Sequence, residues 1–221
     1  MNRAVDKFFE MQLARCRKAL LKNNFEVHDA VDASQARTII LEEIIPQASA
    51  KSVSYGGSLS VEATGVLDVI RSRKDLELHD VFGGDATREE KMERCRRALL
   101  VDLFLTGTNA ITMDGKLVNL DMWGNRVGAI AYGPRHVVVV AGRNKLAANL
   151  EEAMSRTRNL AAPLNAIRHD MNHPRPTPCT ATGECTDCGG EWRICNTWVI
   201  SEKSFPKHRV KVILVNEDLG L

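Results

Sequence analysis

"HVVVVAG", residues 136–142, places four consecutive valines in the middle of one short segment. A β-branched run without polar alternation is typical of a strand that is covered on both faces, as strands in parallel sheets are. Two further apolar runs, "VDLFLTG" at 101–107 and "RVKVILVNEDLG" at 209–220, also have the character of strands. These stretches predict an α/β fold with a mostly parallel sheet flanked by helices.

Segments of period two and of helical period alternate along the rest of the chain. The further predicted strands are "FEVHDA", "KSVSYGG", "LELHDV" and "KLVNLD", the last beside a hairpin turn at Asp114-Gly115. Predicted helices cover 2–23, "DASQARTIILEEII" up to Pro46, "SVEATGVLDVIRSR" as one helix or two, "REEKMERCRRALL" after a Thr87–Glu90 capping box, and 144–162. Such alternation is the pattern of strands joined by crossover helices.

Length and composition favour one globular unit over residues 1–221. Lys and Arg number 30 against 28 Asp and Glu, for a net charge of +2 without a basic tract. We therefore expect no nucleic-acid partner and, without an apolar run of about 20 residues, no membrane partner. The start of the sequence does not resemble a signal peptide, so we expect a cytoplasmic protein. The sequence is compatible with a homo-oligomer.

The segment 171–198 has no lasting periodicity and contains four of the six cysteines, and we interpret it as an insert before the last strand. Cys179, Cys185, Cys188 and Cys195 form a C-x5-C-x2-C-x6-C series. Four thiolates suit a [4Fe-4S] cluster or a structural Zn ion, and the iron–sulfur interpretation is preferred. Disulfides or free thiols are the metal-free alternatives. His169 and His173 are alternative ligands, more simply explained as helix-end or loop residues.

Two cysteines lie outside this segment. Cys16 and Cys95 fall on amphipathic helices, and we interpret them as small core residues.

A candidate ligand site begins at "SYGGSLSVEATG", residues 54–65, where a strand ends at Gly56 and Gly57 and a helix opens near Ser58. Backbone N–H groups and hydroxyls at such a turn suit a phosphate or carboxylate. The simpler alternative is a turn with a serine N-cap. Glu62 is the acid within the turn region, so it is either a catalytic group or a first-turn glutamate that favours the helix dipole.

Two further polar groups follow predicted strands. Parallel strands end at a common edge, so these groups could join the glycine turn around one small anionic ligand, with Arg126 as the counter-charge. The simpler alternative is that Arg126 is a solvated surface residue. Common nucleotide-binding and hydrolase motifs are absent from the sequence. The candidate ligand-binding residues in these two groups are Thr106, Gly107, Thr108 and Asn109, then Asn119, Asp121, Gly124, Asn125 and Arg126.

The segments "YGGSLSVEATGVLDVIRSR" and "FLTGTNAITMDGKLVNLDMWGNRVGAIAYGPRHVVVVAGRNKL" together resemble the lactate utilization (LUD) domain family, and in particular its protein C-like members. The likeness covers nearly the whole chain. The segment "CTATGECTDCGGEWRICN" is similar to a C-terminal cysteine extension carried by some members.

This resemblance implies a fold similar to that of ribose-5-phosphate isomerase, glucosamine-6-phosphate deaminase and the CoA transferases. It also implies a role in oxidation of lactate to pyruvate alongside iron–sulfur oxidoreductase subunits. The alternative is a stand-alone isomerase or CoA-transferase-like enzyme that acts on a phosphorylated or CoA-linked substrate, because Glu62 is placed similarly to the glutamate of CoA transferases.

Overall fold

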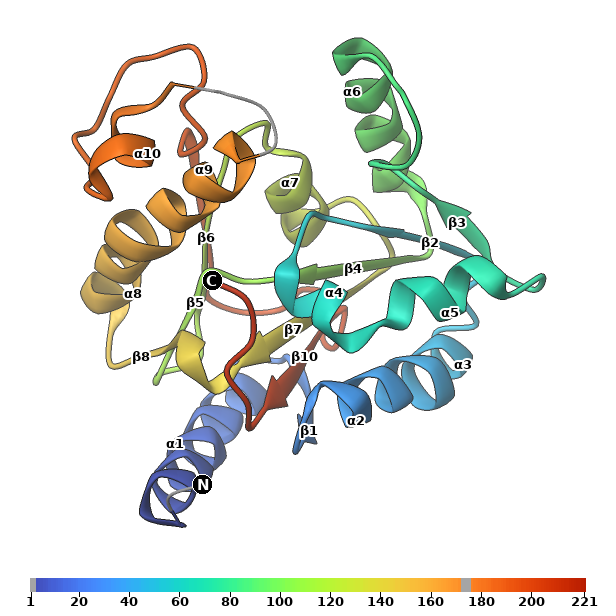
Figure 1. Ribbon diagram of the computed structural model, residues 1–221. Coiled ribbons are helices and arrows are strands. Elements are labelled where there is room, and N and C mark those ends of the chain that lie inside the picture. The colour runs from blue at the N-terminus through green and yellow to red at the C-terminus, as the bar shows by residue number, and fades with distance from the viewer. Residues whose placement is uncertain (1–2, 172–175) are drawn as a thin grey trace.

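The computed structural model describes residues 3–171 and 176–221, and its centre is a six-stranded sheet in which all neighbouring strands are parallel (Figure 1). The strand order is β1-β10-β7-β4-β2-β3. The bounds are β1 (Glu26–Ala30), β10 (Val210–Val215), β7 (His136–Gly142), β4 (Leu103–Gly107), β2 (Ser52–Tyr55) and β3 (Glu77–His79). The predicted α/β class and the strands assigned to this sheet are confirmed.

The valines of β7 lie at the middle of this sheet, between β10 and β4. Val138 and Val140 belong to one apolar cluster, whereas Val137 and Val139 belong to another, and all four are 0% exposed. Alternate side chains of one strand therefore enter two separate cores, as expected for a strand covered on both faces. Burial of a valine side chain contributes roughly 1.5–3 kcal/mol, so this strand is a large source of stability.

Helices cover both faces of the central sheet. The first cluster takes apolar side chains from η1 (Ile39–Ile44), α3 (Ile45–Gln47), α4 (Leu59–Thr64) and α5 (Val66–Ser72), with α2 (Ala33–Thr38) also contributing. The second takes them from α1 (Arg3–Lys22), α6 (Arg88–Arg97), η2 (Ala98–Leu100) and α7 (Asn125–Ala131). Cys16 and Cys95 are buried in this second cluster, which confirms their interpretation as core residues.

A second, smaller sheet stands beside the first, in the order β8-β5-β6-β9. Its strands are β8 (Leu146–Ala147), β5 (Ala110–Thr112), β6 (Leu117–Asp121) and β9 (Thr197–Ser201). The hairpin between β5 and β6 turns at Asp114-Gly115, as predicted. Gly115 has a φ of +84°, and a Cβ there would lie 2.7 Å from the carbonyl carbon of Ala19, so both conformation and space require glycine.

The remaining helical elements lie mainly with this smaller sheet (Figure 1). They are η3 (Arg143–Lys145), α8 (Leu150–Arg156), η4 (Thr157–Ala161), α9 (Ala162–Asp170) and α10 (Pro178–Thr182). Ala153 of α8 packs with Ala110, Val118 and Ala147 of the sheet.

Local signals explain several helix boundaries. Thr87 and Glu90 form both hydrogen bonds of the predicted capping box at the start of α6. Gly65, at φ +67°, separates α4 from α5, so "SVEATGVLDVIRSR" is a pair of helices. Among the described residues, no helix combines the length and the apolar character needed to cross a bilayer.

Three boundaries differ from the prediction. The helix expected at 144–162 begins at Leu150, after an Asn149 cap, because β8 first adds an edge to the smaller sheet. The helical run that was expected to end at Pro46 ends one residue later, at Gln47 of α3. Strand β9 begins at Thr197, inside the segment predicted as irregular, because its partner β6 is distant in sequence.

Candidate functional site

A pocket of about 640 Å³ opens beyond the carboxyl ends of β2 and β4, where open α/β sheets commonly bind ligands. It is also walled by β6, α7 and α9 and by the end of the described chain at Leu221. Residues singled out from sequence that line it are Gly57, Ser58, Glu62, Gly107, Thr108, Asn109, Asp121, Asn125 and Arg126. The fold therefore brings the glycine turn and both later polar groups to one cavity.

Four other candidate residues lie behind the wall of the pocket. Thr106 and Asn119 are 0% exposed, and Gly56 donates its N–H to the Leu105 carbonyl at 3.0 Å. A Cβ on Gly56 would lie 3.0 Å from Cγ of Arg126, so glycine gives this arginine its space. Gly124, at φ +82°, turns the chain into α7. These residues shape the site from behind.

The Arg126 guanidinium uses all five of its N–H donors on protein acceptors. Nε donates to Asp121 Oδ1 at 3.2 Å, and Nη1 donates to Asn119 Oδ1 at 2.7 Å and to the Gly107 carbonyl at 3.4 Å. Nη2 donates to Asn109 Oδ1 at 3.1 Å and to the Leu120 carbonyl at 3.0 Å. Arg126 thus ties together β4, β6 and the turn after β4, and contributes its charge to the pocket through space.

Two buried polar atoms beside this network have no hydrogen-bond partner among the described residues: Asp121 Oδ2 and Asn119 Nδ2. Buried polar atoms are normally paired, so each marks a place where a water or a ligand group would be favourable.

Ser58 and Glu62 each fit both roles that the sequence left open, that of a residue at the start of a helix and that of a residue facing a ligand. Ser58 is the N-cap of α4, its hydroxyl accepting from the Val61 N–H at 3.4 Å, and it also lines the pocket. Glu62 is exposed in the first turn of α4 with its side chain at the same cavity. A capping role and a ligand-facing position are therefore compatible here.

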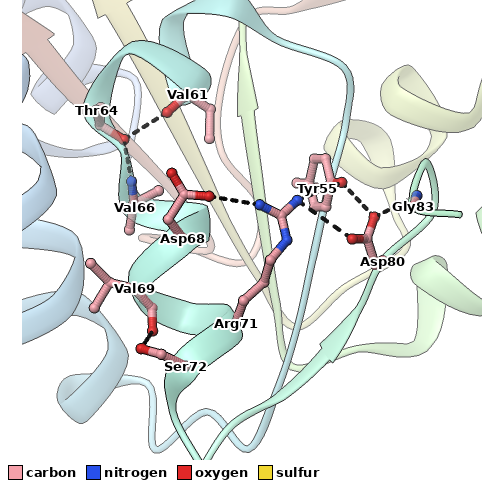
Figure 2. A network of polar contacts seen from close by, with 10 residues as sticks. All are labelled: Tyr55, Val61, Thr64, Val66, Asp68, Val69, Arg71, Ser72, Asp80 and Gly83. Atoms are coloured by element: carbon pink, nitrogen blue, oxygen red, sulfur yellow. Dashed lines mark hydrogen bonds and ion pairs between the residues drawn. The ribbon is translucent and has the colours of Figure 1, made fainter.

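Sequence reasoning missed a polar network at the ends of β2 and β3, drawn in Figure 2. The Tyr55 hydroxyl donates to Asp80 Oδ1 at 2.5 Å, and Arg71 Nη2 lies 3.4 Å from both the Tyr55 hydroxyl and Asp80 Oδ2. Burial and the Asp80 hydrogen bond raise the pKa of Tyr55 well above its usual range, so its hydroxyl stays protonated. The Phe82 and Gly83 N–H groups also donate to Asp80, which fixes the loop that carries Phe82 to the pocket.

Sequence reasoning also missed Lys145, whose side chain enters the pocket from η3, just after β7. It is 5% exposed, and Nζ donates to the Thr108 carbonyl at 3.1 Å. Burial, with smaller contributions from Arg156 and Arg126, lowers its pKa to about 7. Its position after a central parallel strand was the available signal, but "RNKL" was assigned to a helix.

The four segment cysteines line one small pocket of about 20 Å³. All are half-buried free thiols. Arg193 donates to the Cys188 and Cys195 carbonyls at 2.7 and 3.0 Å, and both Arg193 and Arg158 pair with Asp187. Burial raises the pKa of Cys195, which the thiols of Cys185 and Cys188 raise further. The sequence-distant thiols therefore gather in one place.

The residue types fit a thiolate-bound ion or cluster, since four cysteines line one small pocket with two arginines beside them. Yet no three His, Cys, Asp or Glu side chains stand close enough to ligate a metal within residues 3–171 and 176–221. A bound ion would therefore have to draw the thiols together. His169 lies on α9 at the larger pocket, whereas His173 lies outside the described residues.

The two pockets share a wall. Ile194 lines both of them. The Asn196 N–H donates to the Asp121 carbonyl at 2.9 Å, and its Nδ2 donates to the Met122 carbonyl at 3.2 Å. Helix α9 presents Asn165 to the larger pocket and Pro163 to the smaller one. The cysteine segment is thus attached directly to the polar edge of the sheet.

The sequence profile of the LUD domain matches residues 13–215, which is most of the chain. The chain belongs to the LUD domain family. This confirms the resemblance seen in the sequence motifs and relates the chain to lactate utilization.

The LUD chain is similar in structure to a DUF162 family protein from Deinococcus radiodurans, whose crystal structure is known. The TM-score is 0.52 at 12% identity, over 94% of this chain and 98% of that chain. At this identity the likeness concerns the fold alone. The comparison with curated proteins gives no match.

Proposed function

We propose that this LUD domain protein takes part in an iron–sulfur-dependent oxidation of lactate to pyruvate, with a small anionic ligand in the larger pocket and a metal site at the four cysteines. The observation that carries the proposal is the wall shared by the two pockets at Ile194, within a LUD fold. An organic anion and an electron carrier can take part in the same reaction when their sites are adjacent.

The pocket walls favour an anionic ligand. Arg71, Lys91 and Arg168 line it in addition to Arg126, against the acids Glu62, Asp68 and Asp121. Its volume of about 640 Å³ is in the ordinary range for small-molecule and cofactor sites. This volume is larger than lactate alone would fill. It also suits a larger phosphorylated or CoA-linked ligand, which is the ligand class of the alternative function.

Cys179, Cys185, Cys188 and Cys195 would hold the metal. A [4Fe-4S] cluster bound there would accept and release single electrons, whereas Zn would only order the segment. The positive charges of Arg158 and Arg193 would offset the negative charge of the bound thiolates. We propose a cytoplasmic location, where thiols stay reduced, and iron–sulfur oxidoreductase subunits as electron partners.

Anaerobic purification followed by visible absorption and by iron, sulfide and zinc analysis tests the metal site. We expect metal in the wild type and its loss in the double variant Cys185→Ser/Cys188→Ser. Cys95→Ala is the matched control, because Cys95 is a buried thiol of the core cluster and does not line the four-cysteine pocket. A colourless, metal-free wild type with four free thiols would refute the metal site.

One observation favours the second candidate, a stand-alone isomerase or CoA-transferase-like enzyme: the Glu62 carboxyl is exposed at the pocket. A thermal-shift screen with lactate, sugar phosphates and CoA separates the candidates, because a bound ligand raises the melting temperature by mass action. Turnover of a sugar phosphate or CoA ester that disappears in Glu62→Gln would favour the enzyme. Unchanged turnover in that variant would remove Glu62 from the chemistry.

A further inference from the structure

Lys145 is a buried amine in the larger pocket without a carboxylate partner. Nζ donates to the Thr108 carbonyl, and it forms no ion pair in the described part of the chain. A buried ammonium group is costly unless a counter-charge compensates it. The structure gives Lys145 only a neutral carbonyl oxygen, so it favours the uncharged amine.

The charged groups nearest to Lys145 strengthen this preference. Arg126 from α7 and Arg156 from α8 act on Nζ with positive charge. Both guanidinium groups are held in place, Arg156 by the Asn109 and Asn144 carbonyls at 2.8 and 3.0 Å. The pocket acids Glu62, Asp68 and Asp121 form no ion pair with Nζ among the described residues. The pKa of about 7 agrees with this geometry, since it leaves much of the amine unprotonated at neutral pH.

We propose that Lys145 is the pocket's nucleophilic amine and that it condenses with a small carbonyl acid of the 2-oxo acid class. This inference deepens the proposed function and rests on it, because pyruvate, the product of lactate oxidation, belongs to that class. It does not depend on the metal site.

The condensation is balanced without a further reactant. The Nζ lone pair attacks the carbonyl carbon, a C–N bond forms, and the carbonyl oxygen takes up a proton to give a carbinolamine. Loss of this oxygen as water, with both amine hydrogens, leaves a C=N bond. No electrons are exchanged with an outside group. The carboxylate of the acid suits the cations on the pocket walls, of which Lys91 and Arg168 are examples.

Lys91 offers an internal comparison within the same pocket. It is only half-buried, on α6, and therefore keeps the hydration that an ammonium group requires. An ordinary lysine is almost wholly protonated at neutral pH, so it reacts slowly with carbonyl groups. If burial and not mere proximity creates the reactive amine, Lys145 should react and Lys91 should not.

Reductive trapping tests the inference on the full chain. The protein is incubated with pyruvate and sodium cyanoborohydride near pH 7.5, and the adduct is located by peptide mass mapping. We expect one carboxyethyl group at Lys145, at least about tenfold more than at Lys91. Lys145→Arg, which keeps a long side chain with N–H donors but forms no imine, should abolish this adduct. Equal labelling of Lys91 and Lys145, or no label at Lys145, would overturn the inference.

The mapping of the wild type decides the question even if Lys145→Arg does not fold. Lactate has a hydroxyl group where pyruvate has a ketone, so it cannot form an imine with the amine. A comparison of the two compounds therefore separates this inference from the proposed function. A thermal shift with lactate or pyruvate but without an adduct at Lys145 would overturn the inference alone. No shift with either compound, together with no adduct, would overturn the proposed anion site as well.

Discussion

Two arginines, Arg126 and Arg193, show how differently the polar edge of the sheet and the cysteine segment are held. Arg126 is 11% exposed and binds acceptors on β4, β6 and the turn between β4 and β5. Arg193 is 22% exposed, and its acceptors Asp187, Cys188 and Cys195 all belong to the segment itself. One arginine joins elements that the fold already fixes, whereas the other joins a loop to itself. The polar edge is therefore held by contacts between sheet elements, whereas the bonds of Arg193 stabilise only the cysteine segment itself.

The largest expected effect is at Arg126. Arg126→Met would leave the Asp121 carboxylate without its buried partner and would remove one donor from each of the four other acceptors, which costs about 3–5 kcal/mol of unfolding free energy. Urea denaturation measures the loss. Arg96→Met is the matched control, because Arg96 makes only an exposed ion pair with Glu93 and should leave the midpoint unchanged. Equal unfolding free energies of the two variants would mean that the bonds of Arg126 contribute no more stability than an exposed ion pair.

A smaller effect is expected from Lys145, and it depends on pH. The pKa of this lysine falls from 10.5 to about 7 on folding, so the unfolded chain binds more protons between these values. The stability of the wild type should therefore rise with pH through that window, by about 2 kcal/mol between pH 7 and pH 9 from this group. Lys145→Met should lack this rise.

Chemical denaturation at several pH values measures the slopes. Lys7→Met is the control, because the Lys7 side chain is 70% exposed and pairs only with the exposed Glu10 among the described residues, so the pH dependence should stay almost unchanged. Parallel curves for the wild type and Lys145→Met would show that the lysine stays charged in the folded protein.

The smallest effect on global stability is expected at Arg193. Its bonds lie within a half-exposed segment, so Arg193→Met should leave the urea midpoint unchanged while it loosens the four-cysteine pocket. Limited proteolysis between residues 179 and 196 should become faster, and the metal content should fall. A loss of global stability as large as that of Arg126→Met would contradict the contrast between the two regions.

The sequence was sufficient for the central sheet because each strand carried its own signal, most strongly the four valines of β7. Strands β5 and β8 were not assigned because they have three and two residues, too few to show a period. The π-helical turn η1 precedes Pro46, and the helical run ends one residue after this proline, at Gln47.

The same division applies to the site. The glycine turn and the polar residues after β4 and β6 were predictable, because strand ends converge at the edge of a parallel sheet. The five acceptors of Arg126 were not, since they come from several separate positions. Tyr55 and Asp80 meet across neighbouring strands, and the burial of Lys145 depends on the whole pocket. The residue types predicted where the pocket lies. Three-dimensional packing determined the hydrogen bonds of Arg126 and the burial of Lys145.

The position of β10 has a consequence for how the protein is made. This strand is the last in the sequence, yet it lies between β1 and β7 and pairs with both. During synthesis β1 therefore leaves the ribosome early and waits for its neighbour until residues 210–215 have followed. The cysteine segment is translated before that closure, while the sheet is still open. Assembly of this molecule is thus ordered in time, with an interior strand of its larger sheet arriving last.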